Sequence, residues 1–156
     1  MAAKVKYSLP FQICAVARRC TAPSHLLIPG CRFCVDFYLP PGTPILAARS
    51  GVATETESRY ARSYNNQCFM NRCNYVVIRH ADGHESIYAH LAWRSVKVRR
   101  GEKIKIGQTI GLSGQTGYAT YPHLHFGVYD IDNENIPPTF NASLPPKISW
   151  RKFSGQ

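Results

Sequence analysis

The chain has 156 residues, of which 44% are hydrophobic, which supports one compact domain and excludes a mainly disordered protein. Lysine and arginine outnumber aspartate and glutamate by 19 to 9, and the resulting formal charge of +10 favours an anionic polymer as partner. The basic residues are scattered, and no zinc-finger spacing, RNA-binding signature or basic helix accompanies them. We therefore expect no nucleic acid as partner. No segment approaches the ~18 apolar residues of a transmembrane helix.

The first part of the chain, residues 1–35, is rich in cysteine and proline and lacks the apolar period of an amphipathic helix. We expect it to form a tethered loop segment. Its first ten residues, MAAKVKYSLP, contain no apolar core of signal-peptide length. If the protein is exported, we expect this sequence to be the mature form behind an added methionine.

The six cysteines each have a near neighbour in the sequence. An even number in a small basic chain favours disulfides and an oxidising, extracytoplasmic compartment. Pairing by proximity is only one of many connectivities, and the CRFC spacing also fits a redox pair or half of a zinc knuckle. The neighbouring cysteines are Cys14 and Cys20, Cys31 and Cys34, and Cys68 and Cys73.

Beyond the N-terminal segment, short runs rich in Val, Ile, Tyr and Phe alternate with Pro-Gly, Ser-Gly, Asp-Gly and Thr-Gly turns. This pattern predicts a mainly antiparallel β fold, with short helical turns only within 59–66 and 91–98. We expect a single domain over 1–156, with a β core at 36–130 and a proline-rich, extended tail at 131–156 that has a frayed end. The expected strands are 34–38, 44–48, 51–57, 74–80, 84–90, 108–112 and 123–130.

The segment YPHLHF contains two histidines separated by one residue. On a strand, His123 and His125 project from the same side, while Leu124 and Phe126 face the opposite layer. Such a pair fits a metal or catalytic site, because imidazole is a common metal ligand, and it equally fits a tolerated polar face.

Several segments together carry a more specific signal than any one of them alone. In their order and spacing they resemble the lysostaphin-type zinc metallopeptidases, which are peptidoglycan endopeptidases of the lysostaphin and D-Ala-D-Ala metallopeptidase group. The resemblance covers roughly residues 24–130 and implies an antiparallel β-sheet domain of the lysostaphin-like (duplicated hybrid motif) type with a Zn²⁺ cofactor. The segments are SH at 24–25, CVDF at 34–37, PPGTPILAARSGVA at 40–53, NYVVIRHADGHESIYAHL at 74–91, VRRGEKIKIGQTIGLSGQTG at 98–117 and YPHLHF at 121–126.

The resemblance implies three zinc ligands: a histidine, an aspartate a few residues later, and the second histidine of His-x-His. A catalytic zinc takes three protein ligands and keeps one position open for water. The commonest family spacing is His-x-x-x-Asp, but Arg32 stands four residues before Asp36 and cannot bind a metal. One branch of the family carries the first ligand in an upstream SH pair, which His25 matches. We therefore expect His25, Asp36 and His125 as the ligands.

The loop between the first two ligands contains two cysteines, Cys31 and Cys34. A disulfide between them would brace the loop and hold His25 and Asp36 in register. Alternatively, a Cys34 thiolate replaces a histidine as ligand, since thiolates bind zinc well. The two hypotheses exclude each other, because an oxidised cysteine cannot bind the metal.

The resemblance also places two histidines beside the metal without binding it. We expect His123 to act as general base and His90 to donate a hydrogen bond to the oxyanion, with the roles exchangeable. Asn74 matches a recurrent family position, and we expect it to line the substrate groove together with Tyr118 and Tyr121.

Two further histidines, His80 and His84, flank an Asp-Gly turn of a predicted hairpin. We expect both to be solvated turn residues.

These observations favour a secreted or periplasmic zinc endopeptidase that hydrolyses amide bonds in the stem peptides or cross-bridges of peptidoglycan. An anionic cell wall suits the positive charge. One alternative is a catalytically inactive lysostaphin-like domain that acts as a binding or regulatory module. Another is a zinc protein that uses its cysteines structurally and binds nucleic acid.

Overall fold

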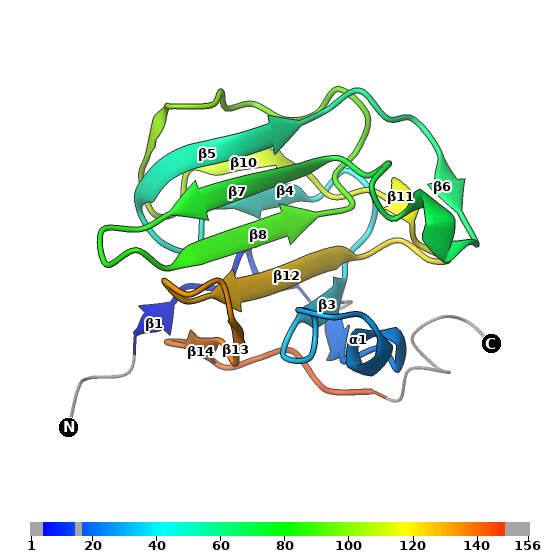
Figure 1. Cartoon of the computed structure of the whole chain (residues 1–156), viewed down its shortest axis with the longest axis horizontal. Coiled ribbons are helices and arrows are strands. Elements are labelled where there is room, and N and C mark those ends of the chain that lie inside the picture. The colour runs from blue at the N-terminus through cyan, green and yellow to red at the C-terminus, as the bar shows by residue number, and fades with distance from the viewer. Residues whose placement is uncertain (1–4, 15–16, 149–156) are drawn as a thin grey trace.

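The computed structural model describes residues 5–14 and 17–148. Its centre is an eight-stranded sheet in which every neighbouring pair of strands is antiparallel. The strands of this sheet are β2 (Arg18–Cys20), β3 (Val35–Tyr38), β5 (Gly51–Glu57), β7 (Tyr75–Arg79), β8 (Glu85–Ala89), β9 (Lys103–Ile104), β12 (Leu124–Tyr129) and β13 (Asn135–Ile136). Their order is β2-β3-β12-β8-β7-β5-β9, and β13 pairs with β12 (Figure 1).

Smaller elements surround this sheet. An antiparallel pair, β4 and β10, lies behind β5 and β7 in the view of Figure 1. Two parallel pairs complete the strands: β1 with β14, and β6 with β11. The bounds are β1 (Lys6–Tyr7), β4 (Pro44–Leu46), β6 (Ser63–Tyr64), β10 (Thr109–Leu112), β11 (Gly117–Tyr118), β14 (Thr139–Phe140), the helix α1 (Ser24–Leu27) and the 3₁₀ helix η1 (Gln67–Phe69).

The mainly antiparallel β prediction is confirmed. Each expected strand has a counterpart whose ends agree within two residues, because runs of β-branched and aromatic residues and the turn residues between them are both local signals. The expected helical turns are wrong: 59–66 contains β6, and 91–98 contains an isolated bridge between Leu91 and Ser113. The helical segments lie instead at α1 and η1, which are too short to show a helical period.

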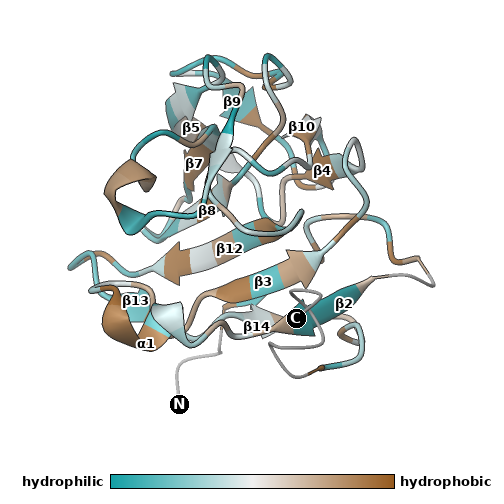
Figure 2. Ribbon diagram, turned by 90° about the vertical axis from the view of Figure 1, so that its right-hand side faces the viewer, coloured by the Kyte–Doolittle hydropathy of each residue, from teal (hydrophilic) through white to brown (hydrophobic). Residues whose placement is uncertain are grey.

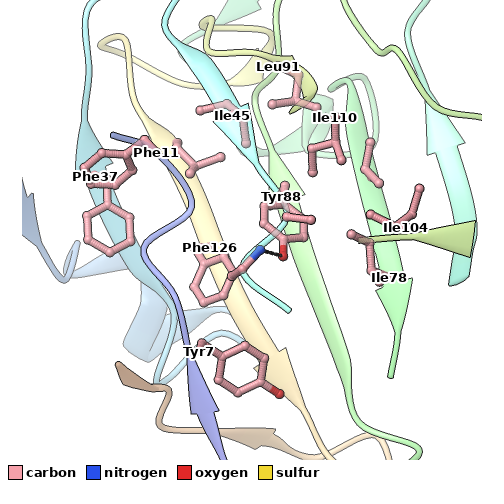
Figure 3. Packing of buried hydrophobic residues seen from close by; sticks show 14 of the residues in the cluster. Tyr7, Phe11, Phe37, Ile45, Ile78, Tyr88, Leu91, Ile104, Ile110 and Phe126 are labelled. Carbon is pink, nitrogen blue, oxygen red and sulfur yellow. Dashed lines mark hydrogen bonds between the residues drawn. The ribbon is translucent and has the colours of Figure 1, made fainter. Parts of the chain in front are cut away.

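The hydrophobic core lies between the main sheet and the β4–β10 pair, and Figure 3 shows part of it. Leu124, Phe126 and Val128 project into it from alternate positions of β12, and each is 0% exposed. The Tyr88 hydroxyl enters the same core and accepts a hydrogen bond from the backbone N–H of Ala48 at 2.9 Å, so its polar atom is satisfied (Figure 3). The inward face of β12 thus anchors the strand, leaving the other face available for polar residues.

His80 is buried, so the expectation of a solvated turn residue is wrong for it. Its side chain is 4% exposed; Nδ1 lies 2.9 Å from the carbonyl oxygen of Ser50, and Nε2 lies 3.0 Å from the Ser86 hydroxyl. Burial lowers the pKa of His80. His84 does lie at the turn, where it is half-buried and its Nδ1 is 2.9 Å from Asp82 Oδ2.

The N-terminal segment and the tail both contain short strands that pair with other strands, so neither forms only loops. β1 pairs with β14 of the tail, β2 extends the main sheet beside β3, and Arg19 forms an isolated parallel bridge with Lys147. The described part of the tail is extended, whereas the expected frayed end, at 149–156, lies outside the described residues.

Among the residues that the structure describes, no helix has the length and apolar character needed to cross a membrane.

Candidate metal centre

Strand pairing brings two of the expected ligands together. In the antiparallel pair of β3 and β12, Asp36 stands directly opposite His125, and His125 Nδ1 lies 3.0 Å from Asp36 Oδ1. Neighbouring residues on the opposite face, Leu124 and Phe126, are held in the core, so both side chains are directed away from it. Figure 2 shows β3 and β12 side by side, with α1 next to them. The register of one strand pair therefore fixes the relative position of Asp36 and His125.

The third expected ligand comes from helix α1. His25 is 4% exposed, whereas Leu26 and Leu27 on the same short helix are 70% and 81% exposed, so this turn directs the histidine inward. The His25 Nδ1 lies 3.1 Å from the Cys34 carbonyl oxygen, which can only accept a hydrogen bond, so Nδ1 carries the proton. The other nitrogen, Nε2, lies 3.3 Å from Asp36 Oδ1.

This arrangement fits a bound cation. His25 Nε2 and Asp36 Oδ1 lie 3.3 Å apart, so a cation that lies with them can bind both atoms. One ligand atom from each of His25, Asp36 and His125 lies within 4.8 Å of the others. Two imidazole nitrogens and one carboxylate oxygen are also a donor set that zinc accepts.

Asp36 is held as a carboxylate. It is 1% exposed, and burial by itself raises its pKa, but the positive potential of His123 and hydrogen bonds with His125 and His25 hold the pKa well below its usual range. Its second oxygen, Oδ2, accepts a hydrogen bond from the Tyr121 hydroxyl at 3.0 Å. Asp36 therefore keeps its charge and one fixed orientation, as a metal ligand requires.

The two histidines expected beside the metal, His90 and His123, lie next to His125 and Asp36, and each has one nitrogen fixed by a backbone carbonyl. His90 Nδ1 is 2.7 Å from the oxygen of Thr116, and His123 Nδ1 is 2.9 Å from the oxygen of Tyr121. Because a carbonyl only accepts, both Nδ1 atoms carry protons and both Nε2 atoms are free in the neutral rings. The two rings lie 4.5 Å apart, and His123 Nε2 is 3.7 Å from Asp36 Oδ1.

Burial controls the charge of these two rings. It lowers the pKa of both His90 and His123, and repulsion from His123 and His125 lowers that of His90 further, to well below its usual value. Burial also acts to lower the pKa of His125, but Cys34 and Asp36 outweigh it and raise this pKa well above the usual value. Burial therefore disfavours a positive charge on His90 and His123, whereas the Asp36 carboxylate favours one on His125.

A cavity of about 370 Å³ opens onto these residues. Its walls are mainly small and apolar side chains together with the loop that precedes β12. Tyr118 and Tyr121, which we expect in the substrate groove, both line the cavity, and the Tyr121 hydroxyl also donates a hydrogen bond to Asp36. The walls include Ala22, Ile28, Met70, Ile87, Ala89, Tyr118, Ala119, Thr120, Tyr121 and Tyr129.

Asn74 lies outside the residues that line this cavity. It is 0% exposed, and its amide oxygen accepts from the backbone N–H of Tyr60 at 2.9 Å. Its amide nitrogen faces the carbonyl oxygens of Tyr60, Leu91 and Ala92 at 2.8, 3.2 and 3.3 Å. These bonds give Asn74 the part of a brace that joins three segments of backbone rather than a contact for substrate.

The cysteines are free thiols in the structure, so the expected disulfides are not present. Cys31 and Cys34 nevertheless lie together beside His125, with Cys31 Sγ 4.0 Å from His125 Nε2. A hydrogen bond from the Cys34 thiol lowers the pKa of Cys31 and raises that of Cys34, and burial raises the latter further.

Sequence reasoning missed two features of this centre. The Tyr121 bond to Asp36 spans 85 positions of the chain, and its only local signal is that Tyr121 precedes His123 by two residues. The carbonyls of Thr116 and Tyr121, which fix the protonation of His90 and His123, are backbone atoms and leave no signal in the side-chain pattern.

Comparison with known proteins identifies the family. The sequence profile of Peptidase family M23 matches residues 32–138. The chain is 40% identical over 125 residues to the peptidoglycan DD-endopeptidase ShyA of Vibrio cholerae, which covers 76% of this chain and 25% of that protein. Lysostaphin of Staphylococcus simulans is 40% identical over 99 residues, covering 62% of this chain and 18% of that protein. The chain therefore belongs to peptidase family M23.

A solved structure supports the same conclusion at the level of the fold. The crystal structure of a zinc-containing peptidase from Vibrio cholerae matches with a TM-score of 0.54 and 33% sequence identity, over 71% of this chain and 30% of that chain. The lysostaphin-like fold is thereby confirmed. The chain spans only a quarter or less of the length of these two curated relatives. Asp36, His90, His123 and His125 lie inside the family match, whereas His25 precedes it.

Proposed function

We propose that this protein is a zinc-dependent endopeptidase that hydrolyses amide bonds in the peptides of peptidoglycan. The observation that carries the proposal is the convergence of His25 Nε2, Asp36 Oδ1 and His125 Nδ1, with the free nitrogens of two further histidines beside them. Two nitrogens and one oxygen complete the protein side of a catalytic zinc site and leave the cavity side open.

The ligand residues would be His25, Asp36 and His125. Zinc bound there supplies a Lewis acid that polarises the scissile carbonyl and makes water a better nucleophile near neutral pH. Around it, the Cys34 carbonyl orients His25, and the Tyr121 hydroxyl orients Asp36. Such outer partners hold the ligands in one rotamer and one protonation state.

His123 and His90 manage protons in this proposal. A neutral ring whose Nδ1–H is bonded to a carbonyl offers Nε2 as a base, so either histidine accepts a proton from the attacking water. The oxyanion role expected for His90 requires Nε2 to be protonated, and repulsion from His123 and His125 opposes that charge. We infer that the pair shares one proton: the ring that has received it donates to the oxyanion or to the leaving amine.

Two observations support peptidoglycan as the substrate. The two relatives described above are a peptidoglycan DD-endopeptidase and lysostaphin, and the formal charge of +10 suits an anionic cell wall. The same substrate places the protein outside the cytoplasm.

The proposal is tested by replacing the ligand that lies outside the family match. His25→Ala is compared with its parent in a chain whose Cys31 and Cys34 are serines, so that thiols cannot hold zinc in place of the histidine. We expect about one zinc per chain in the parent, by mass spectrometry, with release of soluble fragments from purified peptidoglycan. The His25 variant should lose both, whereas His84→Ala, at the distant turn, should keep both.

Other outcomes contradict the proposal. Unchanged zinc content and unchanged fragment release in the His25 variant would exclude His25 as a ligand. A folded parent that neither binds zinc nor releases fragments would exclude the hydrolase.

A further inference from the structure

Two cysteine thiols lie on the far side of His125 from Asp36. Cys31 Sγ is 4.0 Å from His125 Nε2, and both sulfurs and a ring nitrogen of His125 lie within 4.8 Å of one another. The turn between the cysteines is closed by the Cys34 N–H, which donates to the Cys31 carbonyl at 3.0 Å. This turn brings both sulfurs to the same side of the loop.

Cys34 is buried, and its neighbours leave space for its sulfur atom and contact it with polar groups. The side chain is 0% exposed, the Asn135 Nδ2 donates to its Sγ at 3.6 Å, and the Tyr129 hydroxyl lies 3.7 Å away. Gly127 on β12 leaves room for it, because a Cβ there would lie only 2.7 Å from the sulfur. The Tyr129 hydroxyl gives its own proton to the Gly30 carbonyl at 2.8 Å, so the Asn135 amide is the donor that stabilises the anionic, metal-binding form of this sulfur against burial.

The donor set selects a particular class of ion. Two thiolates at a Cys-x-x-Cys spacing with one imidazole nitrogen suit zinc and softer ions such as cadmium, and they suit magnesium or calcium poorly. The nearest basic side chain on the turn, Arg32, stacks over Phe33 at 5.5 Å. Cys31 lines the cavity, which gives an ion a route to the thiols.

The ring of His125 makes this donor set compete with the first one. Its Nδ1 faces Asp36 Oδ1 at 3.0 Å, and its Nε2 faces Cys31. A neutral imidazole has one unprotonated nitrogen, so it offers a lone pair to only one side at a time. An ion held with His25 and Asp36 requires Nδ1 and leaves Nε2–H for the Cys31 sulfur. An ion held by the thiols requires Nε2 and leaves Nδ1–H for Asp36.

We propose that Cys31, Cys34 and the Nε2 of His125 form a second binding site for a thiophilic divalent cation, which cannot be filled together with the His25–Asp36–His125 site. Binding requires that every proton on the two sulfurs and on His125 Nε2 passes to water, and it changes no oxidation state. This second site does not depend on the peptidase activity proposed above. An ion bound at this second site would leave the His25–Asp36–His125 site without its third ligand.

Cobalt(II) distinguishes the two sites without measuring activity, because only thiolate ligands give an intense sulfur-to-metal charge-transfer band in the near ultraviolet. The metal-free, reduced full chain is titrated with Co²⁺ and then with Cd²⁺. We expect the band in His25→Ala and in Asp36→Asn, which both lack the first site. The Cys31→Ser/Cys34→Ser variant should lose it, and Cys14→Ser/Cys68→Ser, which alters two exposed thiols, should keep it.

Cadmium gives the matching affinity. Loss of both thiols should weaken Cd²⁺ binding by more than the roughly 10–100-fold that loss of an outer partner costs. The unmodified chain should bind about one Cd²⁺ ion in total, because the two sites share His125 and cannot both be filled.

Two results would overturn this inference. One is Co²⁺ binding without the charge-transfer band in both first-site variants. The other is a Cys31–Cys34 disulfide in protein purified without reductant, detected by peptide mass mapping, that persists when zinc is present throughout. Neither result bears on zinc binding by His25 and Asp36 in the serine background, so the two proposals fail separately.

Discussion

The candidate metal centre has two halves that are held in different ways. Asp36 and His125 lie on paired strands, opposite each other in register, with their neighbours Phe37 and Leu124 fully buried in the core. His25 lies on a four-residue helix whose other apolar side chains are largely exposed, and it is oriented through the Cys34 carbonyl. A slip of one residue between the strands would turn one of these two residues to the other face and separate them, whereas the loop can change length without moving them.

This difference explains how His25, the first ligand that we propose, can depart from the common family spacing. Because Asp36 and His125 are placed by the sheet, the position of the remaining histidine only has to satisfy distance and direction at Asp36 Oδ1. His25 meets that requirement at 3.3 Å from a helix that begins eleven residues upstream of the strand. The paired strands thus set the positions of Asp36 and His125, and the loop before them sets the position of His25.

The largest effect is expected from replacing Asp36, the carboxylate that the paired strands hold in place. Asp36→Asn removes the negative charge that His25 and His125 share, and we expect fragment release from peptidoglycan to fall by at least about 1,000-fold. Thermal unfolding should show that the fold is kept, since asparagine preserves the side-chain shape. Asp82→Asn, at the distant Asp-Gly turn, is the matched control. Activity of Asp36→Asn within tenfold of the parent, roughly 1.4 kcal/mol in barrier height, would exclude Asp36 as a metal ligand.

A smaller effect is expected at Gly127, where strand β12 contacts Cys34 at the end of the loop. An alanine Cβ at Gly127 would lie 2.7 Å from Cys34 Sγ and 3.2 Å from carbons of Ile87 and Tyr129. Gly127→Ala should therefore lower the free energy of unfolding by about 1–3 kcal/mol and displace the carbonyl that orients His25. Urea unfolding measures the first effect, and zinc affinity the second. Adding Cys34→Ala should recover part of the stability; no recovery would locate the strain elsewhere.

The smallest expected effect is a pH dependence of stability caused by His80, which lies outside the candidate metal centre. Burial lowers the pKa of His80, so the unfolded chain takes up this proton at a higher pH than the folded one. Stability should be complete above the ordinary pKa of about 6.5 and should fall as the pH drops from there towards the folded pKa, by at most about 1.4 kcal/mol per pH unit from this group. Unfolding in urea from pH 7.5 to 5 measures the slope. His80→Asn should flatten it, and an unchanged slope would exclude His80 as its source.

Much of the fold was predictable because its signals are local. Runs of β-branched and aromatic residues along 51–57, 75–79 and 124–129 and the turn residues between them predict the main strands within two residues. The strand period of two predicts that His123 and His125 share a side. In contrast, α1 carries no period that could predict it, and the burial of His80 depends on Ser50 and Ser86, which only the folded sheet brings to its ring.

The sequence by itself determined the β architecture, the family resemblance and the residue types of the centre, because strand period, turn chemistry and motif order are all carried along the chain. Only the tertiary structure decided which atoms meet. Asp36 and Tyr121 are 85 positions apart, Asn74 is a buried brace, and the proton position on His90 depends on the carbonyl of Thr116, 26 residues away. Such contacts arise when the core closes and the strands pair, and no local pattern encodes them.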